Sequence, residues 1–409
     1  MNAGAVIVGA SHAGVQVAAS LRQNGWQEPI HLLSADSELP YHRPPLSKGF
    51  LSGERSAEQL LLRGRQFYSD QGIELVTDCT VGRIDLTARR VESSMGEFDY
   101  ARLILATGAS ARRLAVPGAA LDGVLSLRDM ADARHVKAAL AAAHSVVIVG
   151  GGFIGLEVAA TAVKSGKRVV VLEAQDRLLA RALPQRLSGF LADYHARNGV
   201  VLRMNAAIEG FHGENGQVTA VRLADGTRLE ADLVVVGIGS SANIELATNA
   251  GIPVMAGGIH VDAHGMTTLE GVYAAGDCAS FHNRFWSGPV RVESVQNATD
   301  QARAVAGHCV DKAAPLTAVP WFWTDQYDLK IQMAGLMAPG CEALLRGEIE
   351  TGTFSVLHLR DQRLVSAFSV NRPADHLAAR KLIDQGLEMD LPAAADSAIP
   401  LARAVPKPS

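Results

Sequence analysis

The glycines Gly150, Gly152 and Gly155 lie between an apolar run and an amphipathic stretch, and Glu173 follows the first of them by 23 residues. Glycine at these positions lets the chain turn tightly and lets a pyrophosphate approach the backbone. The helix that follows offers backbone amides and a favourable dipole to the phosphates. An acid after the next strand accepts hydrogen bonds from a ribose 2′-hydroxyl and repels a 2′-phosphate. The pattern predicts an NAD(H) site rather than an NADP(H) site; the alternative is a glycine-rich packing turn without a ligand.

A second turn of this kind near the N-terminus is less regular. Gly9 and Gly14 are present, but Ser11 occupies the position of the middle glycine. Serine is small, so we expect it to be accommodated with a slight displacement of the phosphate. The next strand ends at Ala35 and Asp36, which places the acid beyond its usual position. Taken alone, this turn is also compatible with packing, and its interpretation as a dinucleotide site depends on signals elsewhere in the chain.

The elements that must position these turns are two units of strand, helix and strand. The expected elements are residues 5–9, 15–24 and 31–34 in the first unit, and 145–149, a helix to about 164, and 168–173 in the second. A continuous apolar strand followed by a glycine turn and an amphipathic helix is typical of a parallel sheet. Because the two units begin about 140 residues apart, we expect two nucleotide-binding domains.

The remaining pattern completes the fold class. Further strands are expected at 103–108 and 233–239, which end in glycine, at 272–277, which ends in Asp277, and at 355–359 and 364–370, where polar and apolar residues alternate. A terminal helix is expected near 377–385, and the Ala- and Pro-rich residues 393–409 are expected to form a loosely held tail. We therefore predict an α/β protein with two Rossmann-like nucleotide-binding domains and a C-terminal α+β domain.

The composition is that of an ordinary globular protein, with 48% hydrophobic and 20% charged residues in a chain of 409. A formal charge of −4 argues against nucleic acid as a bulk partner, because phosphate binding requires a basic face. The spacing of Cys79, Cys278, Cys309 and Cys341 provides neither a zinc motif nor a vicinal redox pair, and no metal site is expected. Few cysteines and an N-terminus without a basic region predict a cytoplasmic protein. The apolar run 146–163 contains glycines and an acid, so we expect a strand, a turn and a helix rather than a membrane span.

Two longer segments carry a resemblance to a known family. They are Leu39-Pro-Tyr-His-Arg-Pro-Pro-Leu-Ser-Lys48 after the first unit and Pro320-Trp-Phe-Trp-Thr-Asp-Gln-Tyr-Asp328 in the last domain. Between them lie Ala106-Thr-Gly108, Gly276-Asp277 and Glu293-Ser-Val-Gln-Asn-Ala298. In this order the set resembles the ferredoxin reductases of bacterial oxygenase systems, that is, putidaredoxin-reductase-like and biphenyl-dioxygenase-reductase-like flavoproteins. The resemblance covers essentially residues 4–385.

The resemblance implies a glutathione-reductase-like architecture and two cofactors, FAD and NAD(H). Its domains would be 1–112 and 247–318 for FAD, 113–246 for NAD, and 319–409 at the C-terminus. FAD would contact Gly9, Ser11, Ala13, Gly14, Arg43, Pro44, Lys48, Val81, Thr107, Gly108, Arg128, Asp277, Val295 and Trp323. NAD(H) would contact Gly150, Gly152, Ile154, Gly155, Glu173 and Gly239. The sequence departs from the family at Ala35, where an acid for the adenosine ribose is expected, and either Asp36 replaces it or the hydrogen bond is lost.

Three residues are predicted to act in catalysis. Lys48 would place an ammonium beside the flavin, where it would stabilise the anionic reduced form; otherwise it is a surface lysine. Glu157 would orient the nicotinamide carboxamide and pair with Lys48, although an acid in the first helical turn also complements the helix dipole. Trp323 would stack near the isoalloxazine, the alternative being a core aromatic residue.

The family implies reduction of FAD by NADH and transfer of single electrons to a 2Fe–2S ferredoxin, which serves a haem-thiolate monooxygenase or a ring-hydroxylating dioxygenase. Ferredoxins are acidic, so docking requires a basic patch, for which the candidates are Arg63, Arg65, Arg303 and Lys330. Each of these could also be an ordinary surface charge. The alternatives are a reductase of rubredoxin or another small acceptor, and a redox-sensing flavoprotein like apoptosis-inducing factor. We expect a monomer or a weak homodimer.

Overall fold

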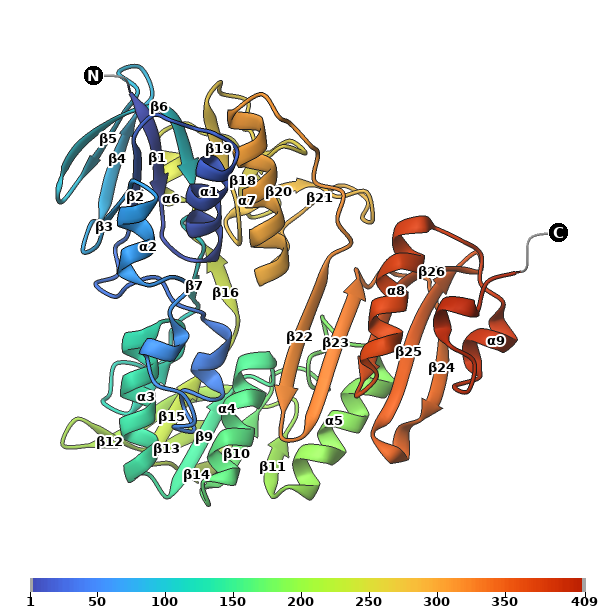
Figure 1. Ribbon diagram of the computed structural model, residues 1–409. Coiled ribbons are helices and arrows are strands. Elements are labelled where there is room, and N and C mark those ends of the chain that lie inside the picture. Colours follow the sequence, from blue (N-terminus) through green and yellow to red (C-terminus); the bar gives the residue numbers. More distant parts are fainter. Residues whose placement is uncertain (1–2, 407–409) are drawn as a thin grey trace. The chain divides into compact units, whose positions relative to one another are not determined.

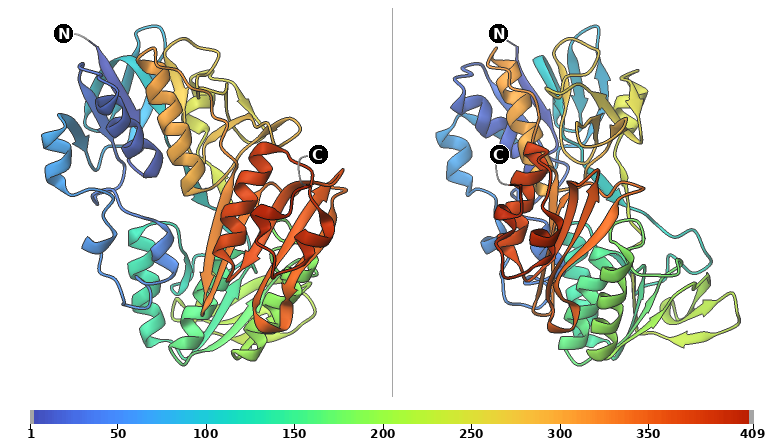
Figure 2. Two further views of the ribbon diagram at one scale, coloured as in Figure 1. Left: turned by 45° about the vertical axis from the view of Figure 1, so that its right-hand side comes forward. Right: turned by 90° about the vertical axis from the view of Figure 1, so that its right-hand side faces the viewer.

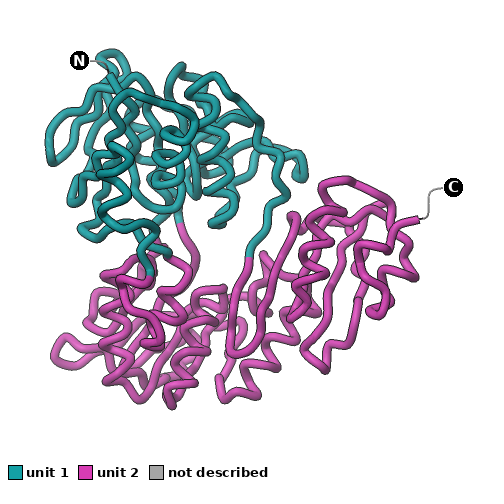
Figure 3. The backbone as a smooth tube through the Cα atoms, viewed as in Figure 1, with its two compact units in different colours: residues 1–42, 60–110, 241–322 teal, residues 43–59, 111–240, 323–409 magenta. Residues whose placement is uncertain are grey.

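A computed structural model of the chain describes residues 3–406. Their backbone divides into two compact units, shown in teal and magenta in Figure 3. Unit 1 holds the described residues up to 42 together with 60–110 and 241–322. Unit 2 holds 43–59, 111–240 and the described residues from 323 onward. The chain therefore passes repeatedly from one unit to the other, and the expected domain ranges remain a separate prediction.

The main sheet of unit 1 is mostly parallel, with the strand order β3-β2-β1-β6-β5-β4 and β19 also paired with β6. Its strands are β1 (Gly4–Val8), β2 (Ile30–Leu33), β3 (Ile73–Val76), β4 (Val81–Asp85), β5 (Arg90–Ser93), β6 (Gly96–Leu105) and β19 (Val272–Ala274). Every residue of β1 is buried, as expected of a central parallel strand that is covered on both faces. The first half of β6 pairs antiparallel with β5, and its second half pairs parallel with β1 and β19.

Two helices of unit 1, α1 (His12–Gln23) and α7 (Val295–Cys309), pack side by side (Figure 1). Their contact is lined by small and aliphatic side chains, among them Ala18, Leu21, Ala302 and Val305, which are all fully or nearly fully buried. The other elements of this unit are α2 (Arg65–Asp70), α6 (Glu245–Asn249), and a small sheet of β17 (Val254–Met255), β18 (Gly258–Val261), β20 (Ala279–His282) and β21 (Pro289–Val290). The helix pair thus fixes where α1 and α7 begin relative to the sheet edge.

Unit 2 contains a second parallel sheet with the order β11-β10-β9-β15-β8. Its strands are β8 (Val124–Ser126), β9 (Ser145–Val149), β10 (Arg168–Leu172), β11 (Val200–Arg203) and β15 (Leu233–Val236), and its helices are α3 (Met130–Ala142), α4 (Phe153–Lys164) and α5 (Gln185–Arg197). An antiparallel sheet of β12 (Ile208–Glu214), β13 (Gln217–Leu223) and β14 (Arg228–Glu230) accompanies it. Two short strands, β7 (Ala109–Ala111) and β16 (Ser240–Ala242), pair where the chain changes units.

The C-terminal part of the chain forms a five-stranded sheet with the order β22-β23-β26-β25-β24. The strands are β22 (Trp321–Gln326), β23 (Leu329–Gly335), β24 (Glu342–Glu348), β25 (Thr353–Arg360) and β26 (Arg363–Val370), and the helices of this part are α8 (Pro373–Gln385) and α9 (Leu391–Ala395). It also contains the 3-10 turns η3 (Ile349–Thr351) and η4 (Leu401–Arg403). Two further 3-10 turns, η1 (Pro44–Ser47) and η2 (Glu58–Leu60), lie nearer the N-terminus. Figure 2 shows α8 along one face of this sheet, where it packs on β23 and β26. Phe190 of α5 packs edge-on against Phe354 of β25, with 5.1 Å between the ring centroids. Both residues belong to unit 2.

The predicted fold class is confirmed by this architecture, including the strand, turn and helix within 146–163. Within residues 3–406 no helix combines the length and the apolar character that a bilayer crossing requires. Two helices begin earlier than predicted, α1 at His12 and α8 at Pro373. In α1 the end of the glycine turn already forms the first helical turn, and in α8 a proline occupies the start of the helix, where its missing N–H costs nothing.

The predicted tail is residues 393–409, and the prediction that it is loosely held is wrong for residues 393–406, which the structure describes. Arg346 of β24 is 1% exposed and donates to the carbonyl oxygens of Ala394 (3.1 Å), Asp396 (2.5 Å) and Ile399 (2.5 Å). Its Nε also donates to Asp375 at 2.9 Å. A buried guanidinium needs a partner for each N–H, and the tail carbonyls supply them. The tail is therefore fixed to the C-terminal sheet.

Candidate functional site

The first glycine turn follows β1 and leads directly into α1. Gly9 has φ +108°, and a Cβ placed on it would lie 2.2 Å from the carbonyl oxygen of Ala106. A Cβ on Gly14 would lie 1.9 Å from the carbonyl oxygen of Gly9. Both positions thus require glycine because strand and helix approach too closely for a side chain. Ser11, in extended conformation, is the N-cap residue of α1, so the turn directs the helix N-terminus toward the end of the sheet.

The predicted FAD residues of unit 1 converge at one edge of its sheet. Val8, Leu105 and Ala274 are register partners, so β1, β6 and β19 end together. Gly9, Thr107, Gly108 and Asp277 follow these three strands, and Ala13 lies close by, since a Cβ on Gly276 would be 3.1 Å from that of Ala13. Ligands of parallel sheets bind beyond the carboxyl ends of the strands. The edge is therefore suited to a dinucleotide, and Val295 starts the helix that packs beside α1.

Thr107 is held in place by a residue that the sequence did not indicate. Its Oγ1 donates to the carbonyl oxygen of Asn243 at 2.7 Å, and Asn243 Nδ2 donates to the carbonyl oxygen of Thr107 at 2.9 Å. Gly108 follows with φ +68° and accepts the backbone N–H of Asn243 at 2.9 Å. These reciprocal bonds fix the chain just beyond β6. The carbonyl oxygen of Asp277 likewise accepts from Arg291 at 3.0 Å.

The carboxylate of Asp36 is used by its own loop. It accepts the backbone N–H of Glu38 at 3.1 Å and the hydroxyl of Tyr41 at 3.0 Å. Ala35 beside it is exposed, and Val81 stands at the start of β4. A carboxylate has further lone pairs, so Asp36 could still accept a hydrogen bond from the adenosine ribose in place of the acid expected at Ala35. That role of Asp36 remains a prediction.

The second glycine turn, in unit 2, repeats the geometry of the first. Gly150 has φ +105°, and a Cβ on it would lie 2.4 Å from the carbonyl oxygen of Gly237. A Cβ on Gly155 would lie 2.2 Å from the carbonyl oxygen of Gly150. Gly152 is the N-cap residue of α4, and Ile154 is 41% exposed in the first turn of that helix. The predicted NAD turn is thus present as a strand-to-helix connection that leads directly into α4.

Glu173 and Gly239 follow the two strands of unit 2 that flank β9, which are β10 and β15. Glu173 Oε2 accepts the backbone N–H of Gly151 at 2.7 Å, and its Oε1 accepts that of Gln175 at 2.8 Å. The acid is therefore fixed against the glycine turn, and its contact with a ribose remains a prediction. Gly239 has φ +100° and follows β15, which is paired with β9.

The ion pair predicted between Lys48 and Glu157 is confirmed, with 3.0 Å between Nζ and Oε1. Glu157 is 4% exposed and Lys48 20%. The hydroxyl of Ser47 donates to Oε2 at 2.5 Å, and that of Thr324 donates to Oε1 at 2.5 Å. A second carboxylate, of Asp325, lies 3.7 Å from the ammonium. The short helix η1 and α4 thus bring residues from distant parts of the chain to one buried carboxylate.

The electrostatics of this cluster are those of a buried carboxylate whose partners oppose the cost of its burial. Burial raises the pKa of Glu157, and the ammonium of Lys48 and the hydroxyls of Ser47 and Thr324 oppose this rise. Because the carboxylate receives an ammonium and two hydroxyl donors, the arrangement suits its ionised form. Lys48 is thereby held at a partly exposed position beside the carboxylate of Glu157.

The other predicted residues of unit 2 flank this cluster. Arg43 donates to the carbonyl oxygen of Arg128 at 2.7 Å, and the backbone N–H of Arg128 donates to Asp132 at 2.9 Å. Pro44 begins η1, which packs on α3 and α4. Trp323 is half-buried in β22, adjacent to Thr324. The structure therefore brings Arg43 to Arg128 and Lys48 to Glu157 within unit 2.

The cysteines of residues 3–406 are all free thiols. Cys79, Cys278 and Cys309 are buried, and Cys341 is half-buried. Burial raises the pKa of Cys278, and it raises the pKa of Cys309 to about 11. No cluster of three or more potential metal ligands occurs among the described residues.

Comparison with known proteins identifies the scaffold. Residues 4–302 match the family model described as pyridine nucleotide-disulphide oxidoreductase, and residues 321–405 match the one described as reductase C-terminal. The chain belongs to the pyridine nucleotide-disulphide oxidoreductase family. It is therefore an oxidoreductase, as predicted, and the family implies binding of FAD and of NADH or NADPH.

Relatives of this family member resemble it over almost their entire length. The ferredoxin reductase subunit of 5,5′-dehydrodivanillate O-demethylase from Sphingobium sp. strain SYK-6 is 43% identical over 404 residues, with 97% of each chain covered. The ferredoxin reductase for the CYP199A2 system from Rhodopseudomonas palustris has a TM-score of 0.95 at 39% identity, covering 99% of this chain and 100% of its own. The covalent putidaredoxin reductase–putidaredoxin complex has a TM-score of 0.94 at 38% sequence identity, covering 98% of this chain and 97% of its own. The resemblance predicted from the motifs is confirmed.

The site also contains residues that the sequence did not single out. Ser47 and Thr324 contact Glu157 directly, and Gln326 and His195 lie behind Thr324. Ser47, Thr324 and Gln326 occur inside the two longest motifs, so their place in those segments was an available signal. His195 lies in an ordinary amphipathic helix and gives no such signal.

Proposed function

We propose that this protein uses NADH to reduce bound FAD and passes the electrons singly to a 2Fe–2S ferredoxin of an oxygenase system. The terminal enzyme would be a haem-thiolate monooxygenase or a ring-hydroxylating dioxygenase. The ion pair between Lys48 and the buried Glu157, which lies on the helix that follows the second glycine turn, carries the proposal. Two similar proteins, the demethylase subunit from Sphingobium and the enzyme from Rhodopseudomonas palustris, are ferredoxin reductases, which supports the choice of acceptor.

The residues of unit 1 fit FAD. The turn begins and ends at Gly9 and Gly14, two positions that no side chain could occupy, and Thr107 and Asp277 follow neighbouring strands at the same end of the sheet. Ser11, Ala13 and Val295 belong to the starts of the two helices at that edge. Bound FAD would supply a carrier that accepts two electrons together and releases them one at a time. The chain's contribution is to bind and orient this group.

In unit 2, Lys48 would provide a fixed positive charge. Its ammonium is held by Glu157 and its side chain is 20% exposed, so it can face a ligand without losing its partner. A preorganised cation of this kind stabilises negative charge that develops during reduction. Glu157, besides holding Lys48, would accept a hydrogen bond from the nicotinamide carboxamide, and Trp323 would offer a planar wall.

Glu173 would select NADH over NADPH. Its carboxylate is fixed against the amide of Gly151 at 2.7 Å, at the end of β10, where a ribose 2′-hydroxyl is expected. A 2′-phosphate at that position would meet a fixed negative charge. Anaerobic titration with each nucleotide tests this: bleaching of the flavin absorbance near 450 nm should require much less NADH than NADPH (the wavelength is roughly that of any oxidised flavin).

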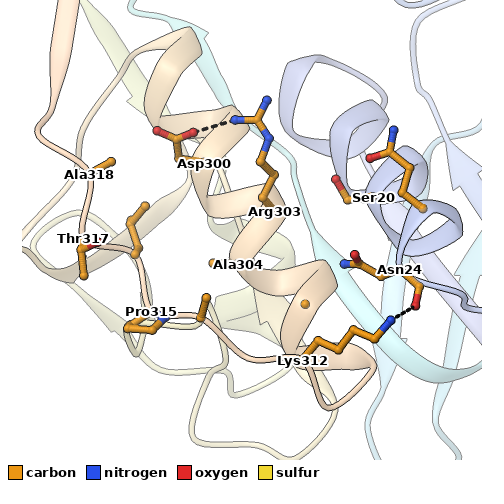
Figure 4. A pocket seen from close by; sticks show the side chains of 13 residues that line it. Ser20, Asn24, Asp300, Arg303, Ala304, Lys312, Pro315, Thr317 and Ala318 are labelled. Atoms are coloured by element: carbon orange, nitrogen blue, oxygen red, sulfur yellow. Dashed lines mark hydrogen bonds and ion pairs between the residues drawn. The ribbon is translucent and has the colours of Figure 1, made fainter.

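Ferredoxin would dock on a basic surface near Arg303. This residue is 58% exposed in α7, pairs with Asp300 at 2.8 Å, and lines a pocket of about 430 Å³ together with Lys312 (Figure 4). Lys312 donates to the carbonyl oxygen of Asn24 at 2.8 Å. The other candidates are the exposed Arg63 and Arg65, also of unit 1, and the exposed Lys330 of unit 2.

Reduction of cytochrome c by NADH tests the acceptor. The protein should reduce cytochrome c rapidly only after a 2Fe–2S ferredoxin is added, and rubredoxin should not replace it. Arg303→Glu should raise the apparent KM for ferredoxin roughly tenfold and leave ferricyanide reduction unchanged. Arg222→Glu, at another exposed and ion-paired arginine, is the matched control. Equal losses with ferredoxin and ferricyanide would contradict docking at Arg303, and rapid reduction with rubredoxin alone would contradict the proposed acceptor.

A further inference from the structure

The buried carboxylate of Glu157 is the end of a longer chain of polar side chains in unit 2. Thr324 Oγ1 lies 2.5 Å from Glu157 Oε1, and Gln326 Nε2 lies 3.2 Å from Thr324 Oγ1. Gln326 Oε1 is 2.8 Å from His195 Nε2, and the hydroxyl of Tyr327 is 3.1 Å from His195 Nδ1. Thr324, Gln326 and His195 are at most 1% exposed. This series of hydrogen bonds joins side chains of α4, β22 and α5, and it ends at the half-buried Tyr327.

The chemistry of the groups assigns a direction to every bond. A carboxylate beside an ammonium only accepts, so the hydroxyl of Thr324 donates to Glu157 and its oxygen accepts from the amide nitrogen of Gln326. The amide oxygen of Gln326 only accepts, so His195 must carry its proton on Nε2. The free lone pair is then on Nδ1, and the hydroxyl of Tyr327 donates to it. All the donors therefore point toward Glu157.

Burial and strand geometry support this assignment. Residues 324 and 326 lie on the same face of β22, because side chains alternate along a strand. Burial lowers the pKa of His195, which keeps the imidazole in the neutral form with a single N–H. A buried polar group without a partner is costly, and this chain leaves none of its members without one. Bonds aligned in this way polarise one another in the same sense.

We propose that Thr324, Gln326 and His195, with Tyr327 at the outer end, form a positioning relay that holds Glu157 ionised and turned toward Lys48. These are positioning residues, since they act on the ligand only through Glu157. The proposal rests on the function proposed above, because it explains how that ion pair is kept in place. A rotation of Glu157 about its side-chain bonds would break the contact with Lys48, and the relay fixes Oε1 against such a rotation.

The first measurement needs neither NADH nor turnover. In protein labelled with ¹⁵N-histidine, the His195 signal, assigned by its absence in His195→Gln, should be that of the neutral Nε2–H tautomer. In protein labelled with δ-¹³C-glutamate, the Glu157 signal, assigned by its absence in Glu157→Gln, should shift in Thr324→Val and in Gln326→Leu. An Nδ1–H tautomer or an imidazolium at His195 in the wild-type protein near neutral pH would overturn the proposal.

The second measurement is the rate constant of flavin reduction by NADH. Thr324→Val and Gln326→Leu should each lower it roughly tenfold, since a hydrogen bond to a charged group is lost or weakened. FAD content and the visible spectrum should be unchanged. Thr324→Ser, which keeps the hydroxyl, should retain the wild-type rate constant and Glu157 signal.

Ser366→Ala is the matched control for loss of a buried hydroxyl. Ser366 is 0% exposed in β26 of unit 2, and its Oγ has no hydrogen-bond partner among the described residues. An equal loss in Ser366→Ala, an equal loss in Thr324→Ser, or a wild-type rate constant and Glu157 signal in Gln326→Leu would each overturn the relay. If NADH fails to reduce the wild-type flavin while the labelled signals respond as described, the proposed function fails and the relay stands.

Discussion

The two glycine turns of this protein have nearly the same backbone and different side chains. Gly9 and Gly150 have φ values of +108° and +105°, and a Cβ on either would meet a carbonyl oxygen of the adjacent strand at 2.2 and 2.4 Å. Gly14 and Gly155 each face a carbonyl oxygen of their own turn at 1.9 and 2.2 Å. The outer glycines are therefore required by the protein's own packing, whatever the ligand.

The middle position is different. A Cβ on Gly152 would have the carbonyl oxygen of Gly237 as its nearest neighbour, at an ordinary contact distance of 3.7 Å. The fold thus accepts a side chain there, which explains why Ser11 can occupy the same place in the first turn. The middle glycine of such a turn therefore serves the ligand rather than the backbone.

A second difference involves two positions that change together. Val8 pairs with Leu33 and Val149 with Leu172, so Ser34 is the register counterpart of Glu173. A Cβ on Gly151 would lie 3.0 Å from the Glu173 carboxylate and 2.6 Å from Leu178. The first turn has Ala10 at the corresponding place, where the smaller Ser34 follows the neighbouring strand. Glycine is needed where the acid folds back on the turn.

The strongest test of the comparison replaces the first glycine of each turn. Gly9→Ala and Gly150→Ala should each destabilise the native turn by about 3 kcal/mol, because a positive φ and a carbonyl clash both oppose the new Cβ. Gly9→Ala should purify without FAD, whereas Gly150→Ala should keep the yellow colour and lose NADH binding. Flavin content and NADH titration measure this. Loss of FAD from both variants would show that the two turns do not serve separate ligands.

The next largest effect is expected at the helix position two residues after the last glycine of each turn, that is, after Gly14 and after Gly155. It is Gln16 in α1, where the amide donates to Ser20 at 2.8 Å, and Glu157 in α4. Glu157→Gln should slow flavin reduction by NADH about thirtyfold, which corresponds to about 2 kcal/mol, because Lys48 loses its counter-charge. Gln16→Glu should change the rate constant less than about twofold. Stopped-flow absorbance measures both, and similar losses in the two variants would remove the distinction between the helices.

The acids after the second strands should differ more modestly. Glu173→Ala should weaken NADH binding roughly tenfold and leave NADPH binding unchanged or improved, since a fixed charge is removed. Asp36→Ala should weaken FAD binding less than about threefold if Asp36 serves mainly its own loop through Glu38 and Tyr41. Equilibrium titration gives both constants. A tenfold loss of FAD affinity in Asp36→Ala would instead assign Asp36 to the ribose.

The smallest effect is expected at the middle position of the first turn. Ser11→Gly should change FAD affinity less than about threefold, because the fold already accommodates a side chain there and the phosphate has adjusted to it. Thermal unfolding of the flavin-loaded protein and FAD dissociation in dilute solution would detect a larger change. A large gain in affinity would mean that Ser11 obstructs the pyrophosphate.

The sequence predicted the turns well because their signals are local. Gly150 and Gly155 are separated by five positions, and the apolar strand before them and the helix after them are visible as periodic patterns. Strand ends such as Thr107 and Asp277 could also be located, since parallel strands end at a common edge. The pairing of Lys48 with Glu157 was accessible only through the family resemblance.

The remaining contacts could not be predicted because they join distant parts of the chain. Ser47 lies 110 positions before Glu157, Thr324 lies 167 positions after it, and Gln326 lies 131 positions beyond His195. A serine or glutamine has many possible partners, and only the approach of α4, β22 and α5 selects one. The tail was misjudged for the same reason, since nothing near residue 393 indicates an arginine in β24.

The buried guanidinium of Arg346 has a consequence for biosynthesis. Its donors are satisfied by carbonyl oxygens of residues 394–399, which are synthesised 48 to 53 positions after Arg346 itself. Until then the C-terminal sheet contains a charged group with unmet hydrogen bonds, so we expect this sheet to complete its folding only after those residues have been made. A nascent or proteolysed chain that ends before residue 394 would therefore be recognisable to cellular quality control as incomplete.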